Sequence, residues 1–387
     1  MTTPTPTLFA PLVLRDITLR NRLVVSPMCQ YSAVDGVAND WHFAHLARFA
    51  LGGFGLVFTE ATAVHRDGRI THGDLGLWND EQIAPLRRIA GFLKSHGAMP
   101  GIQLGHAGRK ASMQRPWHGN GPMDASDTAR GEETWRIVAP SPLPIEQGWL
   151  VPSELTRADM NELRECWRRS VLRAVEAGFE VVEIHGAHGY LLAEFLSPAA
   201  NRRNDAYGGD REGRMRFPLE IAETVRAAWP KNRPVFFRVS SLDGVEGGWS
   251  LDDTVALARA LKARDIDVVD CSSGGIAGSA TAANIPRAPG FQVPFAERVK
   301  REAGIKTMAV GLILEPEMAD AVIRDGKADL VALRREALYH PNWPLHAQRA
   351  LSGEAGFEHW PVQAGWWLER RERGLRALRE SLGQRTR

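Results

Sequence analysis

Two histidines and a tyrosine stand close together directly after an apolar run in the middle of the chain. His185 ends the run VVEIH (181–185), and His188 and Tyr190 follow it. Imidazole and phenol side chains donate hydrogen bonds and exchange protons, so the cluster is a candidate for acid–base work. The two histidines could also bind zinc, as in a metal-dependent aldolase or hydrolase, but a lone HxxH pair is a poor zinc signature. We predict no metal site and keep that rival open.

Arginines gather after two later apolar runs. TMAVG (307–311) ends in Gly311, and LVAL (330–333) is followed by Arg334 and Arg335. Backbone N–H groups beside a glycine and the fork of a guanidinium bind phosphate well together. The pattern predicts a phosphorylated ligand held by Gly311 and Arg335. The alternative is that these arginines are only salt-bridge partners at the rim of the fold.

Eight short apolar runs alternate with amphipathic helical stretches, which is typical of parallel strands joined by crossover helices. The expected strands are 22–26, 56–60, 99–104, 181–185, 235–239, 268–272, 307–311 and 330–333. Eight such units predict an α/β fold, a (β/α)8 TIM barrel, with chemistry at the carboxyl ends of the strands. Gln103, Arg238 and the clusters named above all lie at those ends.

Two segments lie outside the repeating pattern. LFAPLVLRDITLRNR (8–22) reads as an N-terminal β-hairpin that caps the barrel floor. The stretch from about 109 to 153 is rich in Gly, Pro, Trp and Met, and it is far longer than the usual connection of about 2 to 6 residues. It predicts a long loop excursion after strand three. We expect residues 1–387 to form a single domain.

Composition excludes several classes of protein. The formal net charge is only +2, which does not support a nucleic-acid partner. No apolar run reaches the about 18 residues that a membrane span needs, and the N-terminus lacks the features of a signal peptide. We therefore expect a cytoplasmic protein without a membrane partner. The three cysteines are far apart, so neither disulfides nor a cysteine metal cluster is expected.

Several segments, in order along almost the whole chain, resemble the old yellow enzyme family of flavin oxidoreductases. They are SPMCQYS (26–32), EATAVHRDGRIT (60–71), GIQLGHAGRKA (101–111), EIHGAHGYLLAEFLSPAANRRNDAYGGDREGRMRF (183–217) and FRVS (237–240). Cys29 and the HAGRK segment make the chain similar to the thermophilic-like, or xenobiotic-reductase, branch. The resemblance implies an FMN-dependent TIM-barrel ene-reductase with NADPH as the reductant.

The resemblance also implies which residues hold FMN. Ser26, Pro27, Met28, Cys29 and Ala61 would line one side of the ring. Gln103 would bind the pyrimidine edge, and Arg238 would lie near N1 and O2, where a cation favours the reduced cofactor. His185 would touch the cofactor as well. Gly311, Arg334 and Arg335 would surround the phosphate. The family commonly has Gly or Ala where this chain has Arg334, so two arginines would crowd one phosphate.

By the same resemblance, His185 and His188 would bind the oxygen of an enone or nitro compound, and Tyr31 would help to hold it. Flavin N5 would give a hydride to the β-carbon, and Tyr190 would protonate the α-carbon. NADPH would use the same pocket beforehand. The C-terminal tail (360–387) would contact a neighbouring subunit, with Trp367 reaching its active site in a homodimer or tetramer. A flavin barrel that reduces a specialised CoA thioester or xenobiotic remains the enzymatic alternative.

Overall fold

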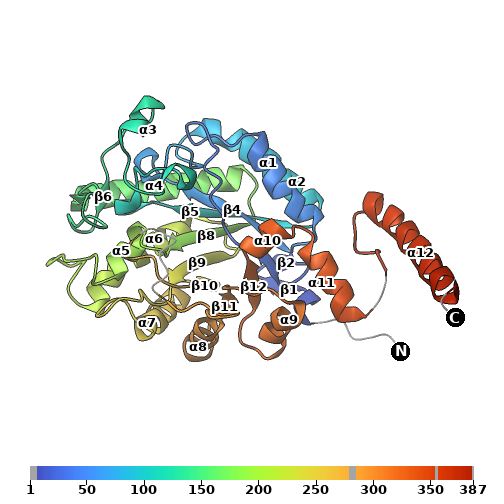
Figure 1. Cartoon of the computed structure of the whole chain (residues 1–387). Helices are drawn as coiled ribbons and strands as arrows, with labels where there is room; N and C mark the ends of the chain where they lie inside the picture. Colours follow the sequence, from blue (N-terminus) through green and yellow to red (C-terminus); the bar gives the residue numbers. More distant parts are fainter. Residues whose placement is uncertain (1–6, 279–284, 354–355, 386–387) are drawn as a thin grey trace.

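The protein is built around a closed barrel of eight parallel strands (Figure 1). The computed structural model describes residues 7–278, 285–353 and 356–385. In barrel order the strands are β3 (Leu23–Val25), β4 (Leu56–Ala63), β5 (Met99–Gly105), β8 (Val181–Gly186), β9 (Val235–Ser240), β10 (Val268–Ser272), β11 (Lys306–Ala309) and β12 (Leu330–Leu333). Pairing of β12 with β3, as in Val331 with Leu23, closes the ring. The expected TIM barrel is confirmed.

Helices surround the barrel, because each strand is followed by an amphipathic segment whose apolar face covers the strands. They are α1 (Asp40–Leu51), α2 (Ile83–Ser95), α4 (Arg157–Glu176), α6 (Arg211–Ala228), α7 (Leu251–Lys262), α8 (Val293–Ala303), α9 (Pro316–Arg324) and α11 (Trp343–Ser352). Capping boxes fix several starts: Ser250 with Asp253 begins α7, and Thr156 with Asp159 begins α4. Two short helices, α5 (Leu191–Leu196) and α10 (Arg335–Tyr339), directly follow β8 and β12.

The expected hairpin closes the floor of the barrel. Strands β1 (Leu12–Leu14) and β2 (Ile17–Leu19) pair antiparallel. Leu12, Leu14 and Leu19 are buried in one apolar cluster with inward side chains of the barrel, among them Phe236 and Met308. This cluster excludes water from the amino-terminal end, so any ligand must enter from the carboxyl end of the strands.

The predicted excursion after strand three is present and carries only short elements. These are a 3-10 helix (Pro116–His118), α3 (Ala125–Ala129), β6 (Val138–Ala139) and β7 (Ser153–Glu154). Met113 and Ile137 from the excursion pack with Ile70 and Tyr190 in a small apolar cluster. The excursion therefore forms a wall behind Tyr190 at the carboxyl end of the barrel.

The last helix, α12 (Val362–Arg385), stands apart from the barrel in Figure 1. It exposes large apolar side chains, including Trp366, Trp367, Leu378 and Leu382. Within the part of the chain that the structure describes, no helix is both long and apolar enough to cross a membrane.

Candidate functional site

A cavity of about 600 Å³ opens at the carboxyl ends of the barrel strands. This volume lies within the usual range of small-molecule sites. Each strand of the barrel, or the segment that follows it, contributes to the lining. Twelve residues that the sequence singled out line it: Pro27, Cys29, Tyr31, Ala61, Gln103, His185, His188, Tyr190, Arg238, Gly311, Arg334 and Arg335. The fold thus gathers in one place residues that lie more than 300 positions apart in the sequence.

Three of the predicted site residues do not line this cavity. Ser26 is fully buried beneath it, and Met28 is buried in the main apolar core. Trp367 lies on α12 with 66% of its surface exposed. Ser26 still takes part indirectly, because its hydroxyl accepts a hydrogen bond from Arg238.

The two histidines and Tyr190 converge because the chain turns sharply after β8. His188 has φ of +61°, a left-handed conformation that few side chains adopt. Its backbone N–H donates to Ser240 Oγ at 2.9 Å, which holds the turn. The ring centroids of His185 and His188 are 5.2 Å apart, and those of His185 and Tyr190 are 5.0 Å apart. All three rings face the same part of the cavity.

A hydrogen bond assigns the proton on the ring of His185. The backbone N–H of Ala187 donates to Nδ1 of His185 at 3.3 Å, so the ring proton is on Nε2. Burial and then the charge of Arg238 lower the pKa of His185 and of His188 well below the usual range. Burial raises the pKa of Tyr190 above that of a free phenol. At neutral pH the cluster therefore presents neutral imidazoles and a protonated phenol, which are hydrogen-bond donors.

The turn at His188 depends on a glycine across from it. A Cβ at Gly275, where φ is +92°, would lie 2.6 Å from Cα of His188. We expect Gly275→Ala to destabilise the fold by about 1 to 3 kcal/mol and to displace His188. Urea unfolding measures the loss. Gly209→Ala is the control, because φ there is +71° but no atom lies within 4 Å. Equal losses in both variants would mean that the contact with His188 has no effect.

Buried partners hold the side chain of Arg238 in place. Its Nε forms an ion pair with Asp270 Oδ2 at 3.1 Å, and its Nη1 donates to Ser26 Oγ at 2.9 Å. Gln103 donates to Glu183 Oε1 at 2.8 Å. The cavity floor therefore offers one guanidinium and one amide, each held by buried partners.

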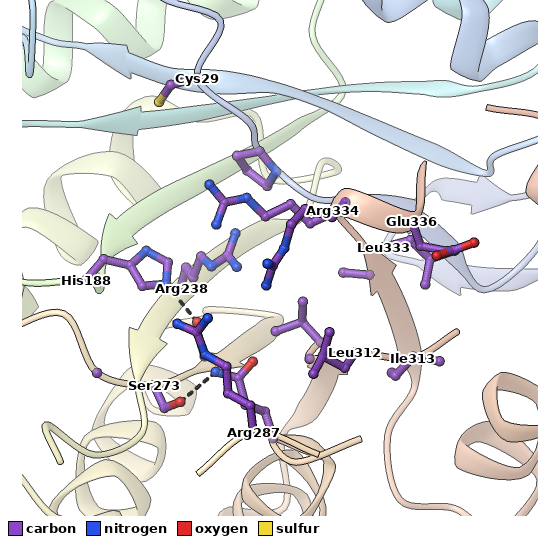
Figure 2. Close-up of a pocket in the computed structure, with 18 of the residues that line it drawn as sticks. Cys29, His188, Arg238, Ser273, Arg287, Leu312, Ile313, Leu333, Arg334 and Glu336 are labelled. Carbon is purple, nitrogen blue, oxygen red and sulfur yellow. Dashed lines mark hydrogen bonds between the residues drawn. The ribbon is translucent and has the colours of Figure 1, made fainter. Parts of the chain in front are cut away.

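The remaining wall is rich in arginine. Arg287, Arg334 and Arg335 join Arg238 around the cavity, as the labelled side chains in Figure 2 show for three of them. Among the described residues, Glu336 is the only carboxylate in the lining. Gly311 has φ of +113°, and a Cβ there would lie 2.8 Å from Oε1 of Gln292, so this wall requires glycine. An excess of positive charge favours an anionic ligand.

Cys29 faces the cavity as a thiol. Burial, followed by the charges of Asp74 and Glu60, raises its pKa well above the usual range, while Arg334 opposes that rise. A thiol of raised pKa is a poor nucleophile. The side chain is therefore suited to contact with a ligand rather than to covalent catalysis.

Some residues at the site were not predicted. Lys110 is buried, and its Nζ donates to the carbonyl of His188 at 3.0 Å and to that of Gly275. Ser272 Oγ lies 2.7 Å from Nε2 of His188 (dashed in Figure 2). Ser272 ends β10, so the rule of reading strand ends could have found it, whereas Lys110 lies five residues after the end of β5.

The zinc alternative finds no support in the geometry. Within residues 7–278, 285–353 and 356–385, no group of three or more His, Cys, Asp or Glu side chains is arranged to hold a metal ion. Nδ1 of His185 is already engaged by a backbone N–H. A ligand set of two histidines would be incomplete for zinc.

Comparisons with known proteins agree with this site. The model of the NADH:flavin oxidoreductase / NADH oxidase family matches residues 7–354. An NADPH dehydrogenase of Geobacillus sp. (strain WCH70) is 44% identical over 346 residues, which is 89% of this chain and 94% of that protein.

Solved structures share the fold. Morphinone reductase superposes with a TM-score of 0.73 at 25% identity, covering 92% of each chain. A 2-naphthoyl-CoA reductase complex superposes with a TM-score of 0.79, but at 23% identity this likeness shows the fold alone, and the chain spans only 52% of that protein. The resemblance to the old yellow enzyme family is confirmed. The chain belongs to the NADH:flavin oxidoreductase / NADH oxidase family and is an FMN-dependent oxidoreductase.

Proposed function

We propose that the protein is an ene-reductase, which uses NADPH to reduce carbon–carbon double bonds next to a carbonyl or nitro group. The observation that carries the proposal is the convergence of His185, His188 and Tyr190 on one part of the cavity, with Arg238 on its floor. Two neutral donors and one protonated phenol suit a substrate that must be polarised at an oxygen and protonated at a carbon.

The cavity fits FMN. Arg335 and the backbone beside Gly311 would hold the phosphate, and the φ of +113° at Gly311 is a conformation that side chains rarely adopt. Gln103 and Arg238 would hold the ring edge, while Pro27, Cys29 and Ala61 would line the ring. Bound FMN supplies a hydride, received from NADPH, to the β-carbon of the substrate. Met28 would act only through its backbone, whereas Ser26 would also act through its hydroxyl, which accepts a hydrogen bond from Arg238.

The chain's own residues would then perform three tasks. Nε2–H of His185, together with His188, donates to the substrate oxygen and draws electron density from the double bond. Tyr190 gives its proton to the α-carbon. Tyr31 and Cys29 limit the space that the substrate can occupy. The apolar wall behind Tyr190 keeps the phenol in place.

Several finer points belong to the same proposal. Cyclic enones, α,β-unsaturated aldehydes and nitroalkenes are the expected substrates, and the CoA-thioester alternative has no feature in its favour here. We place the whole of 1–387 in one FMN-binding unit. We also propose that α12 contacts a neighbouring subunit in a dimer or tetramer, because Trp366 and Trp367 are 45% and 66% exposed.

The direct test follows the colour of the purified protein under anaerobic conditions. NADPH should bleach the yellow flavin, and 2-cyclohexenone should restore it, with cyclohexanone as the product. A flavoprotein that NADPH bleaches and that no enone or nitroalkene reoxidises would contradict the proposed substrate class. A protein that stays colourless with added FMN would contradict the proposed site.

The pH dependence of substrate binding provides a further prediction. Because the pKa values of His185 and His188 are lowered, both rings stay neutral as the pH falls through 6.5, where an ordinary histidine gains a proton. We expect the KM for 2-cyclohexenone to be constant from about pH 5.5 to 8. Steady-state assays at several pH values check this. A one-proton change near pH 6.5 that His188→Gln abolishes would contradict it.

Arg334 gives a prediction about cofactor affinity. Its side chain has no hydrogen bond or ion pair with any described residue, and it is exposed along the wall of the cavity. Since this side chain projects into the cavity (Figure 2), it must move when FMN binds. We expect Arg334→Gly to tighten FMN binding about two- to tenfold, because moving one long side chain costs about 0.5 to 1.5 kcal/mol.

The measurement is fluorescence titration of the apoprotein with FMN. Arg334→Lys is the matched variant, since it keeps the charge on a long side chain and should leave affinity near the native value. Weaker binding in Arg334→Gly with native affinity in Arg334→Lys would show instead that the charge serves the phosphate.

A further inference from the structure

Four polar side chains lie inside the barrel directly beneath the cavity. They are Gln103, Glu183, Arg238 and Asp270, and none is more than 4% exposed. The chemistry proposed above uses Gln103 and Arg238 but neither carboxyl group. Two buried carboxyl groups beside one guanidinium are costly, because only one of them can be neutralised by an opposite charge. The burial of both carboxyl groups therefore needs a physical explanation.

The two acids have different partners. Arg238 and Asp270 are neighbours on the paired strands β9 and β10, and their ion pair measures 3.1 Å. Glu183 and Gln103 are neighbours on β8 and β5, and the amide of Gln103 donates to Glu183 Oε1 at 2.8 Å. Oε2 of Glu183 has no hydrogen-bond partner among the described residues, and neither do the two carboxyl oxygens of Asp270 or Nε of Arg238, so Asp270 and Arg238 interact through their charges. Asp270 is thus paired with a cation, and Glu183 with a neutral amide.

The groups around the two acids increase the difference between Glu183 and Asp270. Burial, and then the charge of Asp270, raise the pKa of Glu183 well above the usual range, against the influence of Arg238. Burial raises the pKa of Asp270 only to about 6, because Arg238 opposes the rise. His185 faces the group from β8 as a neutral ring, and Ser26, the residue after β3, faces it as well. The side chains packed inside the barrel from β4, β11 and β12 are apolar: Phe58, Met308 and Leu330.

We propose that Asp270 and Glu183 set the reduction potential of bound FMN through Arg238. Asp270 is the ionised counter-ion that limits the positive charge presented to the cofactor, and Glu183 is held as a neutral acid. This inference rests on the proposed function, in which Arg238 faces the ring edge of FMN. A cation there stabilises the reduced, more negative form of a flavin, so its counter-ion weakens that effect. Both acids are positioning residues.

The experiment compares the midpoint potentials of the native holoenzyme, Asp270→Asn and Glu183→Gln at pH 7. Asp270→Asn removes the counter-charge and should favour reduced over oxidised FMN at least tenfold, which is about 30 mV for a two-electron couple. Glu183→Gln replaces one neutral group with another of the same shape and should leave the potential unchanged. A loss of packing alone would not separate the two variants in this way.

A second measurement needs no substitution at Asp270 and therefore stands even if Asp270→Asn does not fold. As the pH rises and Glu183 loses its proton, negative charge appears beneath the cofactor and the potential of the native enzyme should fall more steeply. Glu183→Gln should lack this extra slope.

The inference is overturned if Glu183→Gln shifts the potential at pH 7 as much as Asp270→Asn does, or if native enzyme and Glu183→Gln show the same slope at every pH. These results are distinct from failure of the proposed function, which would appear as a protein that binds no FMN or a flavin that no enone reoxidises.

Discussion

Replacing Tyr190 with Phe should slow the reoxidation of the reduced enzyme by 2-cyclohexenone about 10²- to 10⁴-fold and leave its reduction by NADPH nearly unchanged. The phenol is the acid that faces the same space as the two histidines, and its raised pKa keeps it protonated throughout the working pH range. Phe fills the same volume against Ile70, Met113 and Ile137, so the wall of the cavity should not collapse.

Anaerobic stopped-flow absorbance separates the two half-reactions. Molecular oxygen serves as the control acceptor, because its reaction with reduced flavin needs no proton on a carbon atom. We expect native and variant enzymes to react with oxygen at similar rates. If the variant reacted with cyclohexenone as fast as the native enzyme, water rather than Tyr190 would be the proton donor. Equal slowing with both acceptors would indicate a disturbed flavin site instead.

The barrel could be predicted from the sequence because parallel strands that are covered on both faces consist of continuous apolar runs. Each of the eight expected runs overlaps a strand of the barrel, and the differences are at the ends: β4 continues to Ala63 where the run ended at residue 60. The bulge between Phe58 and Ala61 explains that difference, since an irregular register cannot be read from hydrophobicity.

The cavity was predictable where one rule applied, namely that polar residues at the carboxyl ends of barrel strands form the site. That rule gave His185, Arg238 and Arg335. It could not give the roles of Glu183 and Asp270, because their partners come from neighbouring strands that lie tens of residues away. The sequence of a strand does not indicate whether an acidic residue in it faces a guanidinium or an amide. Only the register of β8 with β5 and of β9 with β10 distinguishes them.

The orientation of the two histidine rings could likewise not be predicted from the sequence. The left-handed backbone at His188 is held by Ser240, by Lys110 and by close contact with Gly275, which come from three separate parts of the chain. The spacing HxxH is compatible with rings that point in opposite directions. Convergence is a consequence of tertiary contacts, and for that reason the roles of these histidines need their own test.

Removing either histidine should impair both half-reactions, in contrast to Tyr190→Phe. We expect His185→Ala and His188→Ala each to lower the rate of flavin reoxidation by cyclohexenone about 10²- to 10³-fold, the usual cost of one lost donor to a developing oxyanion. NADPH would use the same donors for its carboxamide oxygen, so flavin reduction should slow as well. The double variant should lose little more than the worse single variant, because the two donors act on one atom.

The control is His96→Ala, since His96 is exposed at the end of α2 and outside the cavity. Flavin content and thermal unfolding show whether the variants remain folded and loaded. A histidine variant with normal reduction by NADPH and slow reoxidation would behave like Tyr190→Phe, and would place that ring in the proton-transfer step alone. Losses that multiply in the double variant would show that the rings bind two different atoms. The proposed geometry requires them to share one substrate oxygen.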